Sequence, residues 1–156
     1  MFLSPSLNKL RELAPGLNNT ADDAAKIVHA VESILTKELS LGIEAAVQFK
    51  WLNITQKKSK VSSLSHRRVA GKFRIAVIEE IRTEFVNDNN CPDIAWELTE
   101  EIPWDQCPRD TKLESFPCLP KLLEKLIENA EETQKRVEEA KKTVREILGT
   151  PILAAT

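Results

Sequence analysis

Cysteine and histidine are the side chains best suited to hold a metal or attack a substrate, and the chain has three cysteines and two histidines. Cys91, Cys107 and Cys118 are separated by 15 and 10 intervening residues. A tetrahedral metal site usually contains a closer pair of cysteines. His29 and His66 lack an orienting carboxylate at a recognisable spacing. We therefore predict structural thiols and boundary or surface histidines, with no catalytic residue and no metal site.

The motifs by which many enzymes hold phosphates and metals are also missing. The sequence has no P-loop, no dinucleotide glycine fingerprint and no helix with paired metal-binding histidines. Only four glycines occur in 156 residues, which leaves little room for a phosphate-cradling loop. The expectation is a non-enzymatic protein without a cofactor. A small enzyme with a pocket beside its tryptophans is a weaker alternative, because no reaction is indicated for it.

Basic side chains accumulate over residues 45–78, where no acidic residue occurs. A two-residue hairpin loop at Ala70-Gly71 would set Arg67 opposite Arg74, and facing like charges destabilise a sheet unless an anion lies between them. A nucleic-acid backbone could supply that anion. The nine acidic residues within 84–114 could equally supply it from within the chain. The candidate residues for an anion or nucleic acid are Lys50, Arg67, Lys72 and Arg74.

Two tryptophans, Trp96 and Trp104, lie in the segment 91–108, which we expect to be an irregular loop with at most a short strand over 94–98. Large aromatic residues on a loop either fix it to the core or serve as anchors for a partner. A loop of this length inside a small domain usually has a function. Trp96 and Trp104 are therefore candidate loop anchors.

One long helix is the element with the clearest periodicity in the sequence. Apolar or small side chains recur at a strict 4-3-4-3 spacing from Leu119 to Leu148, which forms one stripe of a helix. At about 1.5 Å per residue this helix would be about 45 Å long, longer than the expected width of the remaining domain. Its second half either packs on its own domain or projects and pairs with another chain. The candidate partner-binding residues are Ala130, Thr133, Val137, Ala140, Val144 and Ile147.

The remaining pattern predicts an α+β fold with N-terminal helices, a three-stranded antiparallel sheet, the irregular loop, a short helix and the long C-terminal helix. Leu7, Leu10 and Leu13 are expected to point inward from the first helix, which Pro15-Gly16 would end. The helices are expected over 4–14, 21–40 and 108–116, and the strands over 43–51, 61–69 and 72–82. The sheet face expected beneath the helices carries Val47, Phe49, Trp51, Phe73, Ile75 and Val77.

Length and composition limit the classes of protein that fit. We expect a globular domain over residues 1–118, and a helix with a short tail over 119–156 whose start packs on that domain. No apolar run approaches the roughly 18 residues of a membrane span, and no secretion signal is evident at the N-terminus. An odd number of cysteines favours the reducing cytoplasm. The leading hypothesis is an intracellular interaction or assembly protein that binds a protein partner or itself through the long helix. The alternative is a nucleic-acid-binding accessory protein that uses the basic hairpin.

Overall fold

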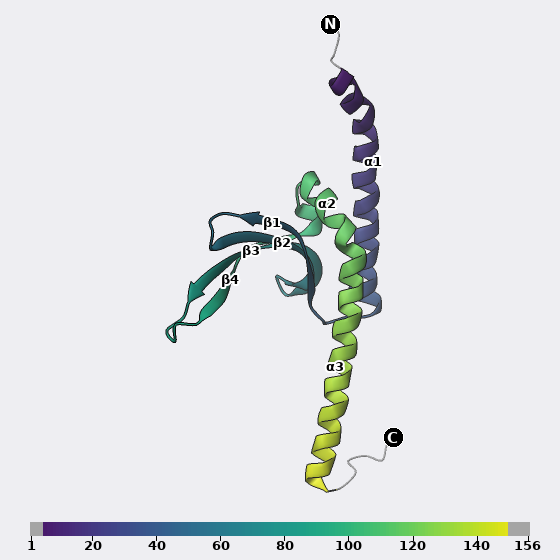
Figure 1. Cartoon of the computed structure of the whole chain (residues 1–156). Coiled ribbons are helices and arrows are strands. Elements are labelled where there is room, and N and C mark those ends of the chain that lie inside the picture. The colour runs from purple at the N-terminus through teal and green to yellow at the C-terminus, as the bar shows by residue number, and fades with distance from the viewer. Residues whose placement is uncertain (1–4, 150–156) are drawn as a thin grey trace.

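The computed structural model describes residues 5–149 and has the expected α+β class (Figure 1). The N-terminal helix α1 (Pro5–Ser33) continues into a π-helical turn, η1 (Ile34–Glu38). The strands are β1 (Ala45–Asn53), β2 (Lys58–Val69), β3 (Lys72–Val86) and β4 (Pro92–Pro103). The chain then forms the 3-10 turn η2 (Trp104–Gln106), α2 (Arg109–Ser115), the 3-10 turn η3 (Phe116–Cys118) and α3 (Leu119–Leu148).

The antiparallel sheet has four strands in the order β1-β2-β3-β4, so the prediction of three strands is wrong. The fourth strand, β4, occupies most of the segment expected to be an irregular loop. It pairs with β3 from Val86 opposite Pro92 to Ala76 opposite Pro103. Pro92 fits there because it is the first residue of an edge strand, where a missing N–H is tolerated.

The asparagine-rich segment 87–90 turns the chain between β3 and β4. The Asn87 side-chain oxygen accepts hydrogen bonds from the backbone N–H groups of Asn89, at 2.9 Å, and Cys91, at 3.1 Å. Asn90 has a φ of 58°, a left-handed conformation that asparagine tolerates. These polar residues therefore form the turn of a hairpin between β3 and β4.

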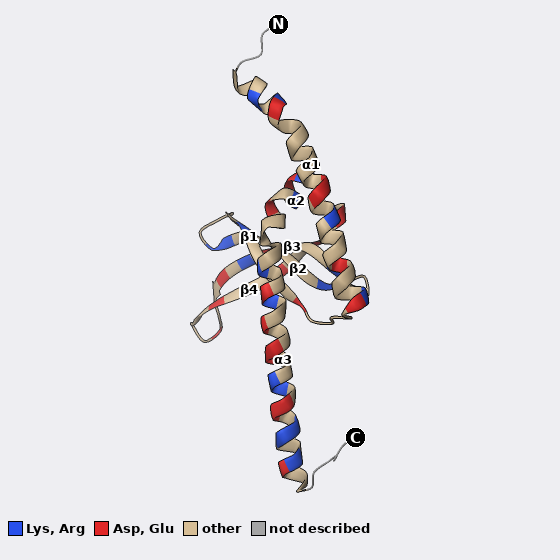
Figure 2. Ribbon diagram, turned by 90° about the vertical axis from the view of Figure 1, so that its right-hand side faces the viewer, with Lys and Arg blue, Asp and Glu red and all other residues tan. Residues whose placement is uncertain are grey.

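The N-terminal region forms one helix, α1, where two were expected. Pro15 lies inside it, and Figure 2 shows the N-terminal part of α1 tilted away from the remainder, as a proline in a helix interior can cause. Leu7, Leu10 and Leu13 are 51%, 59% and 48% exposed. The expectation that these three leucines point inward is therefore wrong.

The hairpin between β2 and β3 has the expected two-residue loop. Ala70 and Gly71 both have positive φ angles, 49° and 85°, as the tight turn that suits twisted strands requires. This loop sets Arg67 directly opposite Arg74.

The core lies between one face of the sheet and the helices. Val28 of α1 and Leu122 of α3 are 3% and 0% exposed and belong to the same buried cluster as Leu64 of β2 and Ile75 of β3. Burying a side chain of this size contributes about 1.5–3 kcal/mol. The cluster consists of Ala24, Val28, Leu35, Ala45, Leu64, Ile75, Val77, Trp104, Cys107, Leu119, Leu122 and Leu126.

Four of the six residues expected beneath the helices, Val47, Phe49, Ile75 and Val77, lie in this core or pack against it. Phe73 is half-buried and stacks on His66 instead, and Trp51 lies outside the core. A register shift between Gln48 and Lys50 adds a residue to β1. Such a bulge moves the following side chains to the other face of the strand. Trp51 is accordingly 48% exposed, beneath the guanidinium of Arg82.

Candidate functional site

The first half of α3 is anchored on the core. Leu119, Leu122 and Leu126 are 4%, 0% and 3% exposed. One turn later, the Asn129 side-chain amide donates a hydrogen bond of 2.9 Å to the backbone oxygen of Glu44. These contacts fix the direction in which the helix leaves the domain.

The second half of α3 has no cover within the described chain. Every residue from 131 to 149 is exposed, and Figure 1 shows this part of the helix extending beyond the sheet and the other helices. Val137, Val144 and Ile147 are 48%, 47% and 77% exposed. Of the six candidate partner-binding residues, Ala130 is half-buried and the other five are exposed; these are Thr133, Val137, Ala140, Val144 and Ile147.

Charged side chains surround this apolar stripe, and Figure 2 shows acidic and basic residues interspersed along α3. Arg136 donates a hydrogen bond to Glu132, and this contact lowers the pKa of the Glu132 carboxyl group. Lys141 lies 3.1 Å from Glu138. Residues 131–148 contain five acidic and five basic side chains. The second half of α3, which projects from the domain, therefore has no net charge from these side chains.

Three of the four basic candidates form ion pairs with acidic residues of the same chain. Arg67 pairs with Glu101 at 3.6 Å, Arg74 pairs with Asp105 at 3.2 Å, and Lys50 pairs with Glu114 at 3.4 Å. These acids all belong to the segment 84–114, so the chain itself supplies anions beside the facing arginines. Lys72, the fourth candidate, is exposed and makes no ion pair within residues 5–149.

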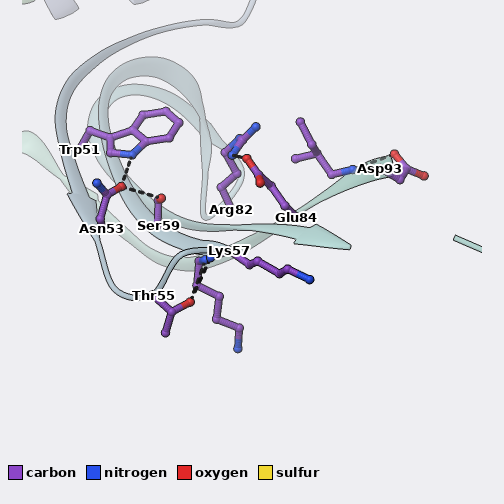
Figure 3. A network of polar contacts seen from close by, with 10 residues as sticks. Trp51, Asn53, Thr55, Lys57, Ser59, Arg82, Glu84 and Asp93 are labelled. Atoms are coloured by element: carbon purple, nitrogen blue, oxygen red, sulfur yellow. Dashed lines mark hydrogen bonds and ion pairs between the residues drawn. The ribbon is translucent and has the colours of Figure 1, made fainter. Parts of the chain in front are cut away.

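The tryptophans differ in position. Trp104 is 1% exposed, and its indole N–H donates to the Ser115 hydroxyl at 3.0 Å, so this candidate anchor lies in the core. Trp96 is 46% exposed on β4, directly opposite Arg82. The Arg82 guanidinium lies 5.6 Å from the centre of the Trp51 ring (Figure 3). Sequence reasoning missed this contact between Arg82 and the exposed Trp51 ring, because the bulge in β1 carries no sequence signal.

The cysteines and histidines are dispersed. Cys91 is exposed and Cys107 is buried, and burial raises the pKa of the Cys107 thiol to about 11. The fully buried His66 uses Nδ1 in a 2.8 Å hydrogen bond with the Ile43 oxygen, and its ring stacks on Phe73. Over residues 5–149, no group of three or more histidine, cysteine or acidic side chains is arranged to hold a metal ion.

A cavity of about 660 Å³ lies between the end of α1 with η1 and the β2–β3 hairpin. Its lining includes Lys72 and Arg74 from the predicted basic set. Sequence reasoning missed the lining residues that α1 and η1 contribute, since only the folded chain brings them to the hairpin.

Comparison with known proteins found no matching protein-family model, no similar curated protein and no similar solved structure. None of the helices in the described part of the chain is long and apolar enough to cross a membrane.

Proposed function

We propose that this protein is a non-enzymatic assembly protein whose chains associate through the second half of α3. The observation that supports the proposal is the exposure of every residue from 131 to 149 on a helix that carries a continuous apolar stripe. Most helices in proteins depend on tertiary packing for their stability. A second copy of the helix would provide that packing.

The form of the stripe favours another helix as its partner. Val137 and Val144 repeat at seven residues, with Ala140 and Ile147 between and after them. This spacing matches the narrow seam of a coiled coil and is narrower than the face of a helix that packs on a globular core. The small side chain of Ala140 allows two helix backbones to approach closely.

The charge of the projecting half favours a second copy of the same chain. Its five acidic and five basic residues balance, so two identical helices do not repel each other through net charge. Closed homo-oligomers are also the commonest form of soluble assembly.

The test replaces Val137 and Val144 together by aspartate and measures the mass of the protein by sedimentation. Because the two carboxylates would be buried in the proposed interface, association should weaken by about a hundredfold or more. Circular dichroism and urea unfolding should show that the double variant remains folded, since neither residue touches the core.

The control variant carries Lys135→Gln and Lys142→Gln. It changes the net charge by the same amount, at the same seven-residue spacing, on the opposite side of α3. It should associate like the unmodified chain. Equal mass for the valine variant and the unmodified chain would contradict the proposal.

We do not propose nucleic-acid binding as the function. Lys50, Arg67 and Arg74 already lie in ion pairs with acids of the same chain, so the facing charges need no external phosphate backbone.

A further inference from the structure

We infer that the cavity between α1 with η1 and the β2–β3 hairpin is a binding site for a small phosphate ester or pyrophosphate compound. The cavity measures about 660 Å³, within the range of sites for small molecules. It contains no residue of α3, so this site is independent of the proposed self-association.

The charge of the lining selects an anion. Lys37, Arg68, Lys72 and Arg74 line the cavity together with a single carboxylate, Glu32. A cleft lined mainly by one sign of charge concentrates the electric field and raises the local concentration of ions of opposite sign.

The single carboxylate is already engaged. Glu32 Oε2 accepts a hydrogen bond of 2.9 Å from the backbone N–H of Ile75, and Oε1 lies 3.9 Å from Nε of Arg74. Arg74 is further neutralised by Asp105, 3.2 Å away. Among residues 5–149, no carboxylate forms an ion pair with the other three cations of the cavity, Lys37, Arg68 and Lys72. Three positive charges therefore remain for a ligand.

The backbone of η1 shapes one wall of the cavity. The N–H of Leu39 bonds to the oxygen of Ile34, five residues earlier, at 2.9 Å. Such π-helical turns are rare and occur frequently at functional sites. Thr36, within this turn, lies against the hairpin, where its hydroxyl donates to the Phe73 oxygen at 3.4 Å. Ser33 and Ser40 add hydroxyl groups to the lining, and hydroxyl groups can donate to phosphate oxygens.

Charge and hydrogen bonding, rather than stacking, would recognise the ligand. The Phe73 ring at this site is stacked on His66, with ring centres 5.3 Å apart, and the Arg68 guanidinium lies 5.4 Å from its centre. Since the Phe73 ring already contacts His66 and Arg68, we do not expect Phe73 to stack on a nucleobase. A compact, multiply charged phosphate compound suits three cations, one of them a guanidinium that can bind a phosphate group through two hydrogen bonds.

The test is calorimetric titration of the full chain with pyrophosphate at low ionic strength. The cavity variant, Lys37→Gln with Lys72→Gln, changes two exposed side chains, so the fold should be retained. The control, Lys57→Gln with Lys58→Gln, removes the same charge at the end of the β1–β2 connection and at the first residue of β2, outside the cavity. We expect one pyrophosphate per chain, binding at least about tenfold weaker in the cavity variant and within about twofold of normal in the control.

Three results would overturn the inference. The first is an absence of binding by the unmodified chain. The second is an equal loss in both variants, which would indicate unspecific attraction. The third comes from titrating a single-stranded oligonucleotide under the same conditions. Binding of the oligonucleotide without binding of pyrophosphate would assign the charges to a nucleic-acid backbone.

Discussion

Ser115 holds the largest fully buried side chain in place. Its hydroxyl accepts a hydrogen bond of 3.0 Å from the indole N–H of Trp104 and donates one of 2.7 Å to the backbone oxygen of Thr111. Ser115→Ala would leave the buried indole N–H without a partner, which costs about 1–3 kcal/mol. We expect a decrease of that size in the free energy of unfolding measured with urea.

The control for Ser115 is Thr143→Ala on the exposed half of α3. Its hydroxyl also bonds to a backbone oxygen one turn earlier, at 3.1 Å from Glu139, but in solvent. The free energy of unfolding should change by less than about 0.5 kcal/mol. Similar losses in the two variants would show that the bond between Trp104 and Ser115 has no special role.

The cysteines should differ in their reaction with a thiol reagent. At pH 8 the exposed Cys91 should react rapidly, and Cys91→Ser should remove this rapid phase. Cys107 should react only after unfolding, because it is buried and its pKa is raised to about 11. Rapid labelling of Cys107 in the folded chain would contradict the described core.

The same thiol gives stability a pH dependence. The pKa of Cys107 is higher in the folded chain than its ordinary value of 9.0, so the folded state retains this proton longer than the unfolded state. The contribution of the buried, protonated Cys107 thiol to the free energy of unfolding is fully present below about pH 9 and is lost as the pH rises toward 11. Cys107→Ala should make the free energy of unfolding fall less steeply over this interval.

At the scale of the elements, Glu32 connects α1 to β3. Its carboxylate accepts the N–H of Ile75 and faces Arg74. Glu32→Ala should therefore lower the free energy of unfolding by about 1.5–3 kcal/mol, the usual worth of a hydrogen bond to a charged group. Glu114→Ala, which removes an exposed ion pair with Lys50, should cost less than about 1 kcal/mol. The comparison is made by urea unfolding, and equal costs would contradict the connecting role of Glu32.

The elements in which apolar residues recur at a regular spacing could be predicted from the sequence. The helix α3 has the expected bounds, and the β2–β3 hairpin has the expected loop, because both depend on spacing within a short segment. Of the strand β4, at most the centre, residues 94–98, was predicted, because its acidic residues and two prolines resemble a loop. It pairs as an edge strand, where charge and proline are tolerated.

Features that depend on distant contacts could not be predicted. Trp104 and Trp96 both lie in the same acidic segment, yet Trp104 is buried by α2 and the core while Trp96 remains exposed on the sheet edge. Pro15 ends no helix, although proline and glycine usually predict an end. The cavity is lined by residues of η1 and of the β2–β3 hairpin, and no sequence pattern connects these two segments.

At the scale of the whole molecule, two helical segments extend in opposite directions from the body that contains the sheet. Figure 1 shows the N-terminal part of α1 at one end and the second half of α3 at the other. The buried cluster ends at Leu126, so the second half of α3 adds nothing to the core.

Removing residues 131–156 should consequently leave a folded monomer. Its free energy of unfolding should lie within about 1 kcal/mol of that of the monomeric Val137→Asp, Val144→Asp variant, because none of the removed residues that the structure describes, 131–149, belongs to the core. Urea unfolding followed by tryptophan fluorescence checks this. A shortened chain that fails to fold would show that the projecting half stabilises its own domain.

Sedimentation equilibrium of the unmodified chain at tens of micromolar tests self-association through α3 most directly. The chain has a mass of 17.6 kDa, and we predict twice that value or a higher multiple, decreasing on dilution. A mass of 17.6 kDa at every concentration would contradict the assembly of this protein through its projecting helix.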